Sequence, residues 1–235
     1  MIRIPDEFLS KTDELYNFTI NHKKKLINSS KNSSWYKPYI HPSLNNFFNS
    51  TDLNNPRISV GFYNDKKDVG AGRMDAINNI LTINLDGFQE DKDIFNSLIQ
   101  HELTHAMDPL VRHNKLFEAY YIKKGSEPDI NLNKYYKSQY EYNAFLTPLV
   151  IKLKNNNIDA KFIIDFFNSI KNTDDTIENY YHNTSNQIRI YLSFGNKDVN
   201  TGYWNFLTEY FNIIKLWSER PTLYKDAMKK IFKNV

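Results

Sequence analysis

SLIQHELTHAMDPL, residues 97–110, is the stretch of this sequence that decides the fold, because it places two of the chain's 6 histidines four residues apart. A helix turns once every 3.6 residues, so His101 and His105 lie on one face if this segment is helical. The apolar stripe that predicts such a helix consists of Phe95, Ile99, Leu103, Ala106 and Met107. The stretch therefore predicts an amphipathic helix with two imidazoles opposite its buried face.

The chemistry of this motif is that of a zinc site with its own base. Two imidazoles on one helical face can bind one metal ion, and the chain has no cysteine, so His, Asp and Glu are the remaining ligand types. Glu102 directly follows His101, where its carboxylate reaches a metal-bound water rather than the metal. We expect one Zn²⁺ bound by His101 and His105, with Glu102 as general base. The alternative is a surface helix with two exposed histidines.

Three segments before the motif have the period of β-strands. Residues 57–65 alternate apolar and polar side chains, residues 70–79 predict a flexible turn and a second strand, and residues 79–86 alternate again. One face of the last segment is fully apolar, which predicts that it lies on a core. That face consists of Leu81, Ile83 and Leu85.

The rest of the chain is helical in pattern, apart from one long loop. Residues 6–27 predict a helix, and residues 28–56 predict a loop with a short helical turn at 44–48. Asp91 or Asp93 is the expected N-cap of the motif helix, which Pro109 ends or kinks. Helices are expected after it at about 113–123, 139–155, 159–171, 174–193, 203–218 and 221–233.

This order of elements predicts an α+β fold with the strands gathered in the first half. We expect a single domain over residues 1–235, with a small sheet packed on the motif helix and a mostly helical second half. Its parts are an N-terminal helix and long loop (1–56), the sheet and motif helix (57–110) and a helical part (111–235).

Composition narrows the classes of partner. A net charge of +3 is too small to predict a nucleic-acid surface, and no apolar run is long enough to span a membrane. The N-terminus has no run of signal-peptide length. We therefore expect a cytoplasmic, viral-particle-associated or non-classically exported protein that acts on polypeptide, binds no nucleic acid and has no membrane span. The sequence leaves the oligomeric state open.

The strand ILTINL (80–85) followed by HELTH (101–105) resembles the zincin metallopeptidases, over about residues 57–150. The resemblance implies a zincin-like fold and a zinc-dependent peptidase, in which a strand at the edge of a small sheet lies above the motif helix and pairs with an extended substrate. The longer segment HELTHAMD (101–108) is also similar to the motif of lethal-factor-type toxin peptidases.

The resemblance also implies a third zinc ligand. The metzincin pattern requires Gly and His where this chain has Asp108 and Val111, so that subfamily is excluded. Gluzincins take a Glu from a later helix, and KSQYEYNAF (137–145) resembles their Glu-x-x-Ala pattern, which makes Glu141 the expected third ligand. Phe145 stands where gluzincins usually have Asp, a departure from the thermolysin-like branch.

Other roles for these residues remain open. Ser138 and Glu141 also form the pattern of a capping box, in which the Glu returns to the N-cap amide. The alternative third ligands are Glu118, Asp108 and His113. Asp108 shares the face of the two histidines and could orient an imidazole, or be a polar residue at a helix end.

A tyrosine or histidine donor often stabilises the oxyanion in zincins. Tyr136 is our prediction for this catalytic role, with Tyr135, Tyr140, His182 and Tyr203 as further candidates. Two functions follow from the whole sequence. The first is a zinc peptidase, most naturally an endopeptidase; the alternative is a zincin-fold structural, virion or host-interaction protein that holds zinc with little or no proteolytic activity.

Overall fold

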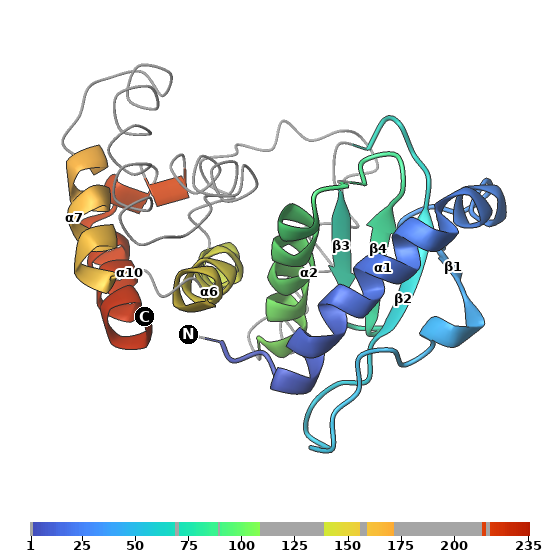
Figure 1. Ribbon diagram of the computed structural model, residues 1–235, viewed down its shortest axis with the longest axis horizontal. Coiled ribbons are helices and arrows are strands. Elements are labelled where there is room, and N and C mark those ends of the chain that lie inside the picture. The colour runs from blue at the N-terminus through green and yellow to red at the C-terminus, as the bar shows by residue number, and fades with distance from the viewer. Residues whose placement is uncertain are drawn as a thin grey trace. The chain divides into compact units, whose positions relative to one another are not determined.

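A computed structural model gives the fold of this chain (Figure 1). The structure describes residues 2–68, 71–88, 90–108, 139–155, 159–171, 213–214 and 217–235. The chain consists of two compact units. The first comprises Met1–Asn131 and Ser138–Pro148, and the second comprises Leu132–Lys137 and Leu149–Val235. The prediction that residues 1–235 form a single domain stays a prediction.

The first unit contains a four-stranded sheet in the order β1-β2-β4-β3. Its strands are β1 (Tyr39–Ile40), β2 (Ser59–Tyr63), β3 (Gly72–Asp75) and β4 (Ile80–Asn84). β2 and β4 are parallel, whereas β1 with β2 and β3 with β4 are antiparallel. The turn between β3 and β4 includes Asn79 at φ 52°, a left-handed conformation that Asn tolerates better than most residues. The three strands predicted at 57–65, 70–79 and 79–86 are thus confirmed, each with shorter bounds.

The two faces of this sheet have different neighbours. Gly72 pairs with Ile83, and a Cβ added at Gly72 would lie 3.4 Å from Leu98 of the motif helix, so this face packs on that helix. The next residues along the strands face the other way. There Gly61 lies under Pro38, at a distance of 2.7 Å for an added Cβ, so the predicted long loop covers the face opposite the motif helix.

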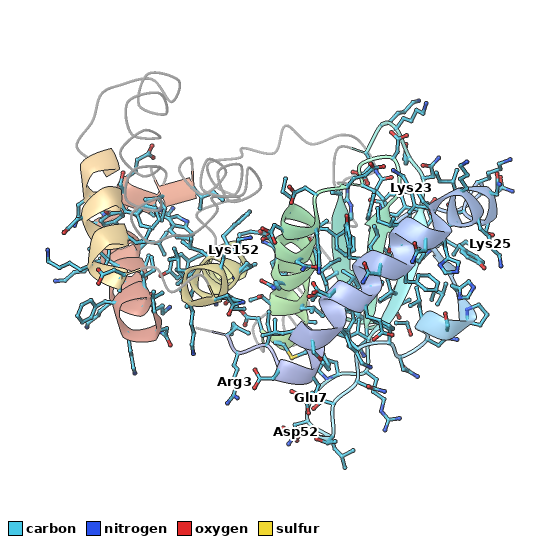
Figure 2. The ribbon with its side chains drawn as sticks, viewed as in Figure 1. Arg3, Glu7, Lys23, Lys25, Asp52 and Lys152 are labelled. Carbon is cyan, nitrogen blue, oxygen red and sulfur yellow. The ribbon has the colours of Figure 1, made fainter. Side chains whose placement is uncertain are left out.

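Two helices complete the core of the first unit. α1 (Asp6–Ser29) packs beside α2 (Lys92–Met107), which lies against β3 (Figure 1). Glu7 and Lys25, labelled in Figure 2, are exposed charged residues of α1. The buried side chains of these helices and of the sheet include Phe8, Leu15, Val60, Phe62, Leu81, Ile83, Phe95, Ile99 and Leu103. The predicted core face of residues 79–86 is therefore confirmed.

The N-cap of α2 is Asp91, one of the two residues predicted for this role. Its Oδ1 accepts hydrogen bonds from the backbone N–H groups of Asp93 and Ile94, at 2.9 and 3.0 Å. These bonds satisfy donors that the first turn of a helix leaves without partners. Most of the predicted apolar stripe is buried, but Met107 at the last turn is only partly so.

The loop predicted at 28–56 contains more regular structure than the sequence indicated. α1 extends to Ser29, and β1 (Tyr39–Ile40) was not predicted, because two residues are too few to show an alternation. The helical turn expected at 44–48 is the 3-10 helix η1 (Pro42–Leu44) instead. Pro42 has a fixed φ suited to the first helical position, and the side chain of His41 accepts a hydrogen bond from the N–H of Ser43.

The edge of the sheet differs from the arrangement that the zincin resemblance implied. The strand ILTINL was expected at the edge, but β4 lies between β2 and β3. The edge strand next to α2 is β3. The physical reason lies in burial: Thr82 and Asn84 on the polar side of β4 are buried too, which suits an inner strand, whereas β3 is mostly half-exposed.

The helices predicted after the motif are confirmed where the structure describes them. α6 (Gln139–Asn155) begins in the first unit and continues into the second, which also contains α7 (Ala160–Lys171) and α10 (Pro221–Asn234). In the second unit Tyr224 donates a hydrogen bond to Asn168 at 3.0 Å, joining α10 to α7. The helices predicted at 113–123 and 174–193, and most of the one at 203–218, lie outside the described residues. The fold is thus mixed α+β, with its sheet in the first half.

Candidate metal centre

The centre begins with the two histidines of the motif. His101 and His105 lie one turn apart on α2, and their Nε2 atoms are 3.2 Å apart. Their side chains are nearly buried, at 12% and 7% exposure. The two histidines therefore do not lie on an exposed surface of the helix.

Glu141, in the first turn of α6, completes a group of three. Its Oε2 lies 3.4 Å from Nε2 of His101, and its Oε1 lies 3.4 Å from Nε2 of His105. The Glu141 side chain is 1% exposed. The ligand atoms of these three residues all lie within 4.8 Å of one another, so this buried cluster could hold a metal ion.

The separations within the cluster are close to those in the ligand shell of a small metal ion. With bonds of 2.0–2.1 Å to a tetrahedral ion, neighbouring ligand atoms stand about 3.3–3.4 Å apart. The observed distances are 3.2 Å between the two Nε2 atoms, 3.4 Å from His101 to Oε2 of Glu141 and 3.4 Å from His105 to Oε1 of Glu141. Charge-assisted hydrogen bonds between a carboxylate and an imidazolium are shorter, at about 2.7–2.9 Å. The cluster therefore has a size that a small metal ion could occupy.

Electrostatics keeps both imidazoles in the form that binds metals. Burial lowers the pKa of His101, and the negative charge of Glu102 only partly opposes this effect. Burial also lowers the pKa of His105 to about 4, against the opposing influence of Glu141. Both rings are therefore neutral at pH 7, with a nitrogen lone pair available for a ligand bond.

Glu102 lies beside the cluster but is not a member of it. Its carboxyl is buried, and burial raises its pKa to about 7, with the charge of His101 opposing and that of Glu141 reinforcing the rise. The backbone of Met74 in β3 forms a hydrogen bond with this carboxylate, which lowers the pKa again. The carboxylate of Glu102, a residue of α2, thus lies against the edge strand β3.

Asp108 lies at the C-terminal end of α2, where its side chain is 1% exposed. Its Oδ2 accepts a hydrogen bond of 3.0 Å from Nδ2 of Asn143, which is 8% exposed and lies on α6. Sequence reasoning did not single out Asn143. The available signal was a polar amide between Tyr142 and Ala144, within an otherwise apolar stretch of α6. A role for Asp108 in orienting an imidazole stays a prediction.

Phe145 has a contact that its sequence position did not suggest. Its ring packs edge-on against His101, with centroids 4.4 Å apart and an angle of 63°. At this position, four residues after Glu141, the gluzincin resemblance implied a carboxylate. An apolar contact with His101 therefore stands in the place of that polar one, and it restricts the orientation of the ring.

Several predicted site residues lie outside the described part of the chain. Tyr136, the predicted oxyanion donor, is one, and Ser138 of the alternative capping box is another. The same holds for the side chain of Tyr140 and for Tyr135, Glu118, His113, His182 and Tyr203. Their proposed roles stay predictions.

Comparison with known proteins does not extend this picture. No family model, curated protein or solved structure matches the chain. Among the described helices, none has both the length and the apolar character needed to cross a membrane. The geometry of the centre is therefore the main basis for a function.

Proposed function

We propose that this chain is a zinc-dependent peptidase with a zincin-like site. His101, His105 and Glu141 bind one Zn²⁺, and Glu102 is the general base. The observation that carries the proposal is the buried cluster of His101, His105 and Glu141, whose possible ligand atoms all lie within 4.8 Å of one another, with the carboxylate of Glu102 beside them. Three protein ligands leave one tetrahedral position for water or substrate, as catalytic zinc sites require.

The donor set supports zinc over other common ions. Two imidazole nitrogens and one carboxylate oxygen suit a borderline ion such as Zn²⁺, whereas Mg²⁺ and Ca²⁺ prefer shells made of oxygen. When bound, the ion polarises a carbonyl and lowers the pKa of a water molecule. Glu102, whose carboxylate lies beside the cluster, would accept the proton of the attacking water and return it to the leaving nitrogen.

The edge strand supports polypeptide as the substrate class. Among the described strands, β3 is the one at the end of the sheet next to α2, and its residue Met74 contacts Glu102 through the backbone. An extended peptide can add to such an edge through main-chain hydrogen bonds. A substrate aligned along β3 would therefore pass close to the proposed base.

The test is the variant Glu102→Gln, with Glu14→Gln as the matched control. The amide keeps the shape of the side chain but cannot accept a proton, so we expect hydrolysis to fall about 10²–10⁴-fold with zinc content unchanged. Glu14 is an exposed residue of α1, and its substitution should change neither quantity. Zinc is measured by elemental analysis, and cleavage of an unfolded protein is measured with and without a chelator.

Two results would contradict the proposal. A purified wild-type protein that binds no zinc would refute the metal site. A protein with stoichiometric zinc that cleaves nothing across a broad peptide library would refute the peptidase, and would favour the alternative of a structural or host-interaction protein that holds zinc.

A further inference from the structure

The ligands of the proposed site come from two different helices. His101 and His105 are on α2, whereas Glu141 is on α6. A shift of α6 along α2 would move the carboxylate away from both imidazoles together. Because metal and catalytic sites tolerate displacements of only about 0.5 Å, something must hold the two helices in register at this point.

One buried contact has the right position for this task. The hydrogen bond from Asn143 Nδ2 to Asp108 Oδ2 joins residues 35 positions apart in the chain. Asn143 is two residues from Glu141, and Asp108 is three residues from His105. The bond therefore ties α6 to α2 within one turn of a ligand on each helix.

The chemistry of the pair makes the contact directional. An ionised carboxylate only accepts hydrogen bonds, so the group opposite Asp108 must be a donor, and the Asn143 amide supplies one. Hydrogen bonds to charged acceptors are stronger than those between neutral groups. Both side chains are buried, so water does not readily replace the amide as a donor.

We propose that Asn143 is a positioning residue, which acts through Asp108 to hold Glu141 at the distance from the two histidines that a metal ion requires. This inference rests on the proposed function, since it takes the three-residue cluster to be the zinc site. It assigns to Asn143 no contact with metal or substrate. Asn143 raises the affinity for zinc, because it holds the three ligands in place before the ion binds.

The experiment is a double-mutant cycle of Asn143→Ala, Asp108→Ala and the variant carrying both. The Zn²⁺ affinity of the folded protein is measured by competition with a chelating dye, and the melting temperature is measured without metal. We expect each single variant to bind Zn²⁺ about 10–100-fold more weakly. The double variant should be no weaker than the worse single one, because both substitutions remove the same contact.

A matched control separates positioning from general stability. Asn96 on α2 also donates its amide to a carboxylate, that of Asp13, but this contact is exposed and joins α2 to α1 rather than to α6. Asn96→Ala should therefore leave Zn²⁺ affinity unchanged. If Asn143→Ala fails to fold, Zn²⁺ affinity is measured on the double variant instead. In the double variant both partners of the hydrogen bond are removed, so the buried carboxylate that would lack a donor is also gone.

The outcomes distinguish this inference from the proposed function. If the wild type binds no Zn²⁺, both are overturned. If the wild type binds Zn²⁺ and Asn143→Ala binds it equally well, only the positioning role is overturned, even where the melting temperature falls. Strictly additive losses in the cycle would also overturn it, because the two residues would then act independently.

Discussion

Helix α2 has polar contacts on two sides, and the two sides contrast in burial. At the junction with α1, Asp13 contacts Lys92 at 2.7 Å and Asn96 at 2.6 Å, and the Asp13 and Lys92 side chains are 53% and 45% exposed. At the junction with α6, Glu141 faces two histidines and is 1% exposed. Water can form hydrogen bonds with the exposed groups at the α1–α2 junction, but not readily with the buried groups at the α2–α6 junction. The buried groups at the α2–α6 junction must therefore find their partners within the protein or in a bound cation.

The two junctions differ in what their polar groups contribute to stability. Exposed ion pairs contribute about 0–1 kcal/mol and tolerate substitution. Burying an ionisable group is costly unless a partner of opposite charge or a metal compensates. A buried cluster of two imidazoles and a carboxylate is thus a feature that stability alone does not favour, which is consistent with a functional site.

The largest effect should follow from removing a ligand at the α2–α6 junction. Zn²⁺ at 100 times its dissociation constant should stabilise the wild type by about 2.7 kcal/mol, because it binds the folded state only. In His101→Ala we expect this stabilisation to disappear. Thermal unfolding with and without Zn²⁺ measures it, and a variant that retains the full stabilisation would show that His101 is not a ligand.

A smaller effect should separate the two roles considered for Glu141. Glu141→Gln keeps the volume of the side chain and can still cap a helix, but it loses the anionic oxygen. We expect Zn²⁺ affinity to fall at least about 10-fold, since even an outer partner of a metal site contributes this much. The melting temperature without metal should change little. Unchanged affinity would instead direct the search for the third ligand to Glu118 and Asp108.

The smallest effect is expected at the α1–α2 junction. Partial burial raises the pKa of Asp13, but the hydrogen bonds from Lys92 and Asn96 outweigh it and hold this pKa below its ordinary value. A carboxyl with a lowered pKa stabilises the folded state above its unfolded pKa, and this contribution is lost as the pH falls through the folded pKa.

Asp13→Asn should therefore reduce the free energy of unfolding at pH 7 by less than about 1 kcal/mol, because solvent screens the pair. The difference from the wild type should shrink as the pH falls below about 4, near the ordinary pKa of Asp. Urea unfolding at pH 7 and pH 3 measures both values. A loss as large as that at the α2–α6 junction, or one independent of pH, would contradict the contrast between the two junctions.

The sequence alone predicted the local features of the chain. The bounds of α6, the start of α1 and the N-cap Asp91 follow from side-chain periodicity and from hydrogen bonds between residues less than five positions apart. The pairing of His101 with His105 belongs to the same class, since one helical turn brings them together whatever the rest of the chain does.

The relations between distant segments were decided only by the tertiary structure. From the sequence, Glu141 was one of several possible third ligands. In the structure, contact between α6 and α2 places one of its carboxylate oxygens 3.4 Å from each imidazole. Packing likewise made β3 rather than β4 the edge strand, and brought Asn143 to Asp108. Such contacts depend on which apolar faces pack against one another across the whole chain. A local sequence pattern does not determine that choice.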